Sequence, residues 1–143
     1  MRLQILDDAE IRPSLFVWNG PIEEGCIKRW LKLHKVTFSE EIVTFLTKTG
    51  GGDLFESETL LGPLGNAELG DDLDSINCFY WETGLPKELV IFHTGLGDLT
   101  AFDTIKKDYV QISEIDHIET QRFSSFDQWY QKTQEVSMLS AMV

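Results

Sequence analysis

One histidine and two aspartates are the residues of this chain whose types and spacing could do chemistry. His93 closes an apolar run, and Asp98 and Asp103 stand on either side of the next one. If the two runs are paired strands, the three side chains converge, and a histidine with two carboxylates can hold a metal ion or perform acid–base catalysis. Alternatively, both aspartates accept hydrogen bonds from turn backbone. His34 and His117 are isolated, so we predict no metal and no cofactor and keep a small metal-dependent hydrolase as an alternative.

The glycine-rich segments do not indicate nucleotide chemistry. Gly50-Gly51-Gly52-Asp53 follows a predicted helix, whereas a phosphate loop follows a strand and carries Gly-Lys-Ser/Thr. Gly95-Leu96-Gly97-Asp98 lacks the third glycine of a dinucleotide fingerprint and precedes a predicted strand. No serine or cysteine has the context of a nucleophile elbow. We therefore predict that this protein is not an enzyme and has no catalytic residues, and that it acts by binding another protein.

The negative charge is concentrated in one third of the sequence. Residues 53–103 contain eleven acidic residues and a single base, Lys87, and so supply -10 of the formal net charge of -12. A concentrated negative field repels nucleic acid and anionic lipid and attracts basic proteins. Acidic loops also keep proteins soluble, and charge alone does not decide between these two roles.

An aromatic pair lies close to several acidic residues of this acidic third. Tyr80 and Trp81 are adjacent, and aromatic side chains surrounded by charge are the usual anchors of protein interfaces. One of the pair is expected to point into the core and the other outward. The predicted partner-binding residues are Asp53, Glu56, Asp71, Asp72, Asp74, Tyr80, Trp81 and Glu82.

Length and composition indicate one globular domain over residues 1–143. The chain is 42% hydrophobic, which is enough for a single core. No apolar run approaches the roughly 20 residues of a membrane span, and the start of the chain does not resemble a signal peptide. Cys26 and Cys78 fit small buried hydrophobes in a reducing compartment, so we expect a cytoplasmic protein. Residues 136–143 are expected to be loosely held.

The periodicity predicts helices, then an antiparallel meander, then a helix. Residues 1–20 are mixed, with short strands possible at Leu3 and Ile5 and from Leu15 to Trp18. Helices are predicted over 22–34 and from a cap at Thr37 or Ser39 to Gly50. Segment 53–84 carries weaker secondary-structure signals. Leu60 and Leu61 indicate a strand, and Gly65-Asn66 and Gly70-Asp71 indicate turns. Residues 72–81 are predicted to be irregular or a short helix. Strands are predicted at 88–93, 99–103, 109–112 and 117–120, and a last helix at Ser125. This order is typical of an α+β fold.

Three segments resemble the SUKH superfamily, also called the SMI1/KNR4 family. They are the helix that ends in glycines, 45–52; the strand, glycine turn and strand over 85–103; and the Ser-Phe-x-x-Trp helix start over 123–129. The motif positions are Gly50, Gly51, Gly52, Pro86, Gly97, Asp98, Phe102, Asp103, Phe126 and Trp129. The resemblance spans about residues 22–134; Thr49-Gly50 departs from the family's usual Asn-Gly, and residues 1–20 are not placed on the family pattern.

The resemblance implies an α+β fold with a central mixed or antiparallel sheet and helices packed at its face and ends. It also implies a protein partner, because bacterial members are commonly immunity proteins that neutralise a toxin, often a nuclease. Fungal members are regulatory scaffolds, and an interaction module without a toxin stays open as the alternative. The small size of this chain is similar to the bacterial type. A basic toxin domain as partner would give the acidic segment a role in encounter, with neither nucleic acid nor membrane bound.

Overall fold

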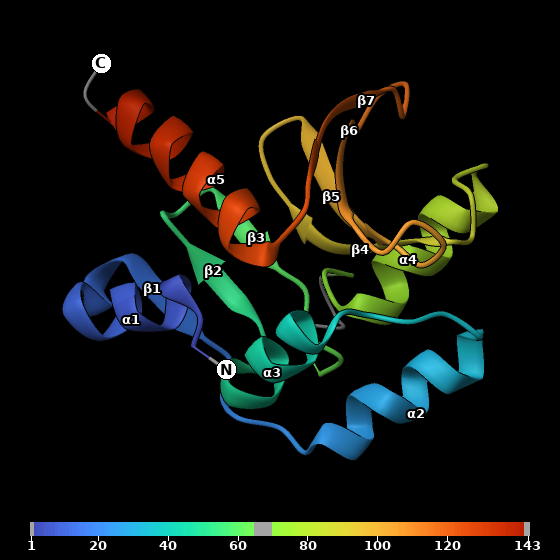
Figure 1. Ribbon diagram of the computed structural model, residues 1–143, viewed down its shortest axis with the longest axis horizontal. Helices are drawn as coiled ribbons and strands as arrows, with labels where there is room; N and C mark the ends of the chain where they lie inside the picture. Colours follow the sequence, from blue (N-terminus) through green and yellow to red (C-terminus); the bar gives the residue numbers. More distant parts are fainter. Residues whose placement is uncertain (1, 65–69, 142–143) are drawn as a thin grey trace.

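The computed structural model describes residues 2–64 and 70–141, with side chains as far as residue 136. Its elements follow the chain in the order shown in Figure 1: α1 (Gln4–Ile11), the 3-10 turn η1 (Pro13–Leu15), β1 (Phe16–Trp18), α2 (Glu24–His34), α3 (Glu40–Thr49), β2 (Gly52–Leu54), β3 (Glu58–Leu60), α4 (Leu73–Glu82), β4 (Leu89–Thr94), β5 (Asp98–Asp103), β6 (Tyr109–Ser113), β7 (Glu119–Phe123) and α5 (Phe126–Ala141). The predicted turn at Gly65-Asn66 lies outside the described residues.

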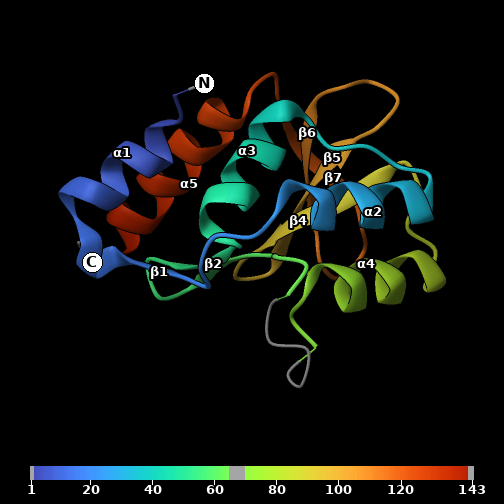
Figure 2. The ribbon, with the colours of Figure 1, turned by 90° about the horizontal axis from the view of Figure 1, so that it is seen from below.

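The described strands form one open sheet in chain order, β1 to β7, and each strand is antiparallel to the next. The α+β prediction is confirmed, and the sheet is antiparallel rather than mixed. Figure 2 shows α1, α3 and α5 gathered at one side of the molecule and α2 beside α4 at the other. Phe126 and Trp129 of α5 are fully buried in the core, as expected of motif residues.

The N-terminal segment that the family pattern did not place is partly helical. The possible strand at Leu3 and Ile5 is wrong, since helix α1 begins at Gln4, whereas the strand ending at Trp18 is present as β1. Leu3 and Ile5 are both buried. The helix is held against α5, where the Tyr130 hydroxyl donates to Asp8 over 2.7 Å. Long-range packing therefore overrides a short alternating pattern.

Local signals position the helix ends. Ser39, rather than Thr37, caps α3, because its hydroxyl accepts the Ile42 N–H over 3.2 Å. Gly50 ends the helix with φ of +71°, the left-handed conformation that the glycine run predicted. The uncertain stretch 72–81 is a helix, α4, whose first turn is capped by the carboxylate of Asp72.

A β-bulge in β4 decides which way His93 points. Ile91 pairs with Ala101, but His93 pairs with Thr100, so one extra residue is inserted in β4. Successive strand residues normally alternate between the two faces, and a bulge breaks that alternation. As a result Phe92 and His93 both contact Trp129 of α5, at ring-centroid distances of 5.1 and 4.9 Å.

Candidate functional site

Three titratable side chains converge on the sheet face beneath α5. They are Glu58 of β3, His93 of β4 and Asp98 of β5, and their ligand atoms all lie within 4.8 Å of one another. His93 is 1% exposed, and its Nε2 lies 2.6 Å from Glu58 Oε2. The predicted pairing of His93 with Asp98 is present. Glu58 was missed because nothing in the sequence shows that β3 pairs with β4 in the register Leu60 to His93.

Asp103 does not join this group, so the predicted convergence of His93, Asp98 and Asp103 is wrong for its third member. Asp103 lies at the opposite end of β5 and accepts the N–H groups of Ile105 and Lys106, as the turn-backbone interpretation expected. It also pairs with Arg122 over 3.2 Å. Burial raises the pKa of Asp103, but these hydrogen bonds outweigh it and hold the pKa below its usual value.

The acidic residues of segment 53–103 do not form one exposed face. Asp72 is buried as the cap of α4, and Asp103 is buried with Arg122. Glu58 and Asp98 line the cavity beneath α5. Several carboxylates of the acidic segment are therefore buried or partly buried, and its exposed acidic surface is smaller than the sequence suggested.

Asp74 remains on the surface, where α2 holds it. Its Oδ1 accepts the indole N–H of Trp30 over 2.9 Å and lies 3.2 Å from His34 Nε2. The hydrogen bond from Trp30 lowers the pKa of Asp74. Partial burial of the carboxylate acts in the opposite direction but is the smaller effect. Trp30 and His34 are thus the α2 side chains that face α4, whereas Lys28 and Lys32 line a hollow between α2 and α3.

Tyr80 and Trp81 point in different directions, and both are partly buried against the core rather than one inward and one outward. The Trp81 indole N–H donates to the Leu89 carbonyl over 2.9 Å, and its ring stacks on Trp30 at 6.0 Å. Tyr80 points away from this stack, with its hydroxyl 3.4 Å from Glu114 Oε1. Tyr80 is therefore the member of the pair that contacts a carboxylate of another segment.

Glu114 brings the turns of the sheet next to α4. Its N–H donates to the Gly97 carbonyl, so the β4–β5 and β6–β7 turns touch. Tyr80 also meets His117 of the second turn at a ring distance of 5.6 Å. We take Tyr80, Glu114 and the exposed residues next to these contacts in the chain together and call them the α4–turn surface: Phe79, Tyr80, Glu82, Leu96, Glu114, Ile115 and Asp116. The sequence prediction missed its β6–β7 part because those residues lie outside segment 53–103.

Asp53 and Glu56 lie elsewhere, in the β2–β3 hairpin within the sheet. Asp53 is exposed and accepts the hydroxyl of Thr59 over 2.9 Å. Both residues belong to this hairpin, and neither belongs to α4. The eight predicted contact residues are therefore divided between two places, and Asp71, Asp72, Asp74, Tyr80, Trp81 and Glu82 make up the larger group, at and just before α4.

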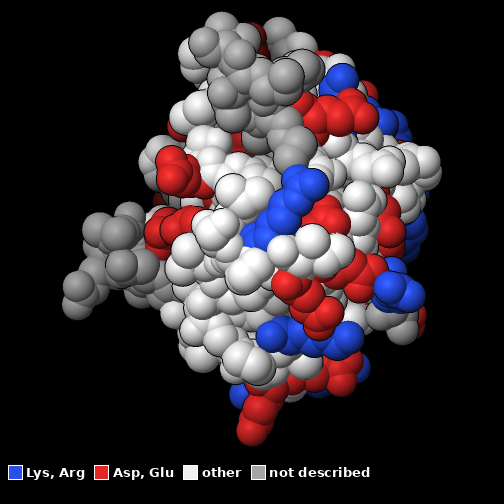
Figure 3. All heavy atoms as spheres, turned by 90° about the vertical axis from the view of Figure 1, so that its left-hand side faces the viewer, with Lys and Arg blue, Asp and Glu red and all other residues white. Residues whose placement is uncertain are grey.

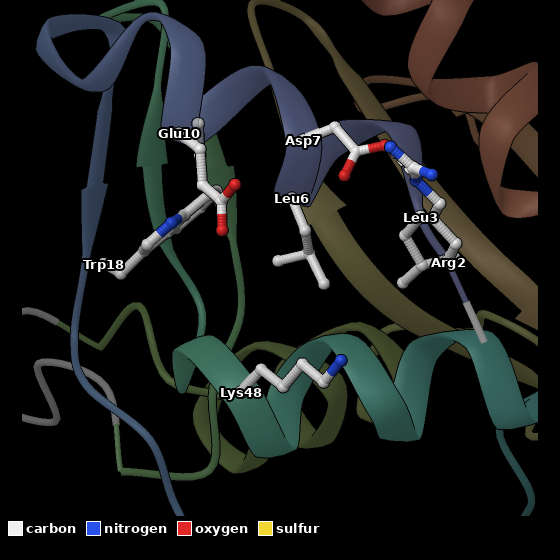
Figure 4. A pocket seen from close by; sticks show the side chains of 8 residues that line it. Arg2, Leu3, Leu6, Asp7, Glu10, Trp18 and Lys48 are labelled. Atoms are coloured by element: carbon white, nitrogen blue, oxygen red, sulfur yellow. Dashed lines mark hydrogen bonds and ion pairs between the residues drawn. The ribbon is translucent and has the colours of Figure 1, made fainter.

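A separate hollow of about 490 Å³ lies between α1, β1 and α3. Figure 4 shows Leu6 and Lys48 pointing into it from opposite sides, with Trp18 and Glu10 at one end. Arg2 at its rim pairs with Asp7 over 2.9 Å. The face around α1 mixes acidic and basic side chains (Figure 3). Both acidic and basic side chains line this hollow, so its charge does not favour one class of ligand.

Comparison with known proteins identifies the family to which this chain belongs. Within the described residues, no helix is both long and apolar enough to cross a membrane. A search of curated proteins found no match. The model of the SMI1 / KNR4 family (SUKH-1) matches residues 21–132, which is most of the chain and contains all three resembling segments. On this match, together with the α+β fold, the chain belongs to the SMI1/KNR4 family (SUKH-1).

Proposed function

We propose that this chain is an immunity protein that binds and neutralises a basic toxin domain through its α4–turn surface. Family membership supports a non-enzymatic binding module in general terms. The observation that carries the proposal is the combination of exposed apolar side chains and carboxylates on this one surface.

Apolar side chains stand out from the α4–turn surface. Phe79 is 57% exposed, Leu96 82% and Ile115 92%. Large exposed apolar side chains that lie together mark interaction sites, since each gains free energy when a partner covers it. They come from α4 and from two turns that Tyr80 and Glu114 link, and we expect one partner to cover all three.

Carboxylates border these apolar residues. Glu82 ends α4, and Glu114 and Asp116 lie in the β6–β7 turn. A nuclease toxin binds nucleic acid, and its working surface is therefore expected to be basic. A carboxylate rim would raise the association rate with such a surface and would orient the complex, while the apolar centre supplies affinity.

The partner to test is the product of the gene directly upstream of this chain's gene, where the proposal expects a toxin domain. We expect tight one-to-one binding whose association rate falls as salt is raised from about 50 to about 500 mM. The double reversal Glu114→Lys with Asp116→Lys should slow association by about tenfold or more at low salt. The matched control is Asp53→Lys with Glu56→Lys, which makes the same charge change on the β2–β3 hairpin.

The control separates a local contact from net charge. If both double variants slow association equally, the α4–turn surface is not the contact and only overall charge matters. If the upstream gene encodes no toxin, and a pull-down from the native cell captures a regulatory protein instead, the immunity proposal is wrong. A regulatory interaction module of the family would then replace it.

A further inference from the structure

We propose that Glu58, His93 and Asp98 form a binding site for one divalent transition-metal ion, for which Zn²⁺ is the probe. The donor set is one imidazole nitrogen and two carboxylate oxygens, within 4.8 Å of one another. Zinc and similar ions accept these ligands, and three protein ligands leave one position open. This site is independent of the proposed toxin-binding surface.

The ligand atoms face a cavity rather than packed side chains. A cavity of about 280 Å³ is lined by Glu58, His93 and Asp98, with Lys132 and Thr133 contributed by α5. Thr133 is 8% exposed and lines this cavity from α5. A buried polar side chain facing a polar cavity is typical of a place that holds water or a ligand.

Neighbouring groups hold the three ligands in place. The Trp129 indole N–H donates to Thr100 Oγ1 over 3.0 Å, and that oxygen lies 2.9 Å from His93 Nδ1. His93 therefore directs its Nε2 at Glu58 and the cavity. Gln111 donates to Asp98 Oδ2 over 2.9 Å. Partners of this kind orient metal ligands and raise metal affinity.

Gly95 gives the two carboxylates room to approach. A Cβ at this position would collide with Glu58 Oε2 and lie 2.6 Å from Asp98 Oδ1. The backbone of Gly95 thus borders both carboxylates, and they share a small volume with one buried imidazole. Two carboxylates so close repel each other, and a cation between them removes that repulsion.

One other group of possible ligands exists among the described residues, on the surface: His34, Asp74 and Cys78. Its Asp74 oxygen already accepts the indole N–H of Trp30. Burial, with the nearby Asp74 carboxylate, raises the pKa of the Cys78 thiol, which disfavours the thiolate that binds metal. The inner group is therefore the better site.

The test is calorimetric titration of the purified, metal-stripped full chain with Zn²⁺, with Co²⁺ absorption as a second readout of the ligand field. Wild type should bind one equivalent of Zn²⁺. Glu58→Gln and Asp98→Asn should each weaken binding by about tenfold or more. Gly95→Ala should also weaken it, because the added methyl group pushes the carboxylates apart without removing a ligand.

Asp103→Asn and Cys78→Ser are the controls, and both should bind Zn²⁺ like wild type. Circular dichroism and thermal unfolding of each variant without metal show whether it folds. Absence of stoichiometric binding by wild type overturns the proposal. So does unchanged affinity in folded Glu58→Gln and Asp98→Asn, or loss of binding in Cys78→Ser, which would assign the metal to the surface group.

Discussion

Asn77 completes the hydrogen bonding of Ile91 as a neighbouring strand would. Its side-chain amide donates to the Ile91 carbonyl over 2.9 Å and accepts the Ile91 N–H over 2.7 Å. Strand β3 ends at Leu60, which pairs with His93, so it does not extend alongside Ile91. The fully buried amide of Asn77 therefore joins α4 to the central strand of the sheet.

Replacing Asn77 should destabilise the protein strongly. Asn77→Ala leaves a buried N–H and a buried carbonyl of Ile91 without partners, and we expect a loss of about 3 kcal/mol in the free energy of unfolding. Urea denaturation measures it. Asn19→Ala is the control, because the exposed Asn19 makes one hydrogen bond to the Gly50 carbonyl, and its loss should cost about 1 kcal/mol or less. Equal losses would contradict the strand-like role of Asn77.

Asp103 should make the stability of the protein depend on acid pH. Its pKa is held below the usual value, so the ionised carboxylate stabilises the fold above the ordinary pKa of about 4. That stabilisation is lost as the pH falls through the lower pKa of the folded protein. Asp103→Asn should therefore be less stable than wild type at pH 7, and the difference should shrink near about pH 2. Urea denaturation at several pH values checks this, and a constant difference would refute it.

Glycine substitutions should distinguish backbone strain from close packing. Gly52 and Gly84 both have positive φ, of +147° and +113°. A Cβ on Gly52 would collide with the Val17 carbonyl of β1, whereas a Cβ on Gly84 meets no atom within 4 Å. We expect Gly84→Ala to cost about 1 kcal/mol and Gly52→Ala about 3 kcal/mol or more. Thermal unfolding measures both, and similar losses would show that the approach of β1 is not limiting.

Truncating Trp81 should lower the stability of the fold, whereas truncating Phe79 should weaken partner binding. Trp81 is tied to Leu89 and stacked on Trp30, so Trp81→Ala should cost about 2 kcal/mol of stability. Phe79 is largely exposed, so Phe79→Ala should leave stability within about 0.5 kcal/mol and weaken partner binding by about tenfold. Denaturation and binding assays on the same samples test this. A stable Trp81→Ala that binds poorly would place Trp81 in the interface instead.

Most elements of the fold were predictable because their signals are local. The strands near residues 88–93, 99–103 and 109–112 and the helix after Ser125 were predicted from alternation and capping patterns, and the structure has β4, β5, β6 and α5 there. Helix α1 was not predicted, since its apolar residues also fit a short strand and its packing on α5 depends on residues far along the chain. The last helix continues to Ala141, into the segment expected to be loosely held.

The candidate sites were only partly predictable. His93 and Asp98 were identified, but Glu58 is 35 residues from His93 and joins it only through the pairing of β3 with β4. The bulge after Ile91 also has no clear signature in the sequence, although it turns His93 towards α5. Glu114 was missed for a similar reason, because its relation to Tyr80 depends on how α4 lies against the turns.

The sequence by itself determined the family, the antiparallel meander and the ends of helix α3, because periodicity, caps and glycines act within a few residues. Only the tertiary structure decided which carboxylates are surface charges and which are internal. Asp72 and Asp103 are buried with hydrogen-bond donors, whereas Glu82 and Asp116 remain exposed. Burial and pairing depend on distances in space, and these arise from contacts between segments that are remote in the chain.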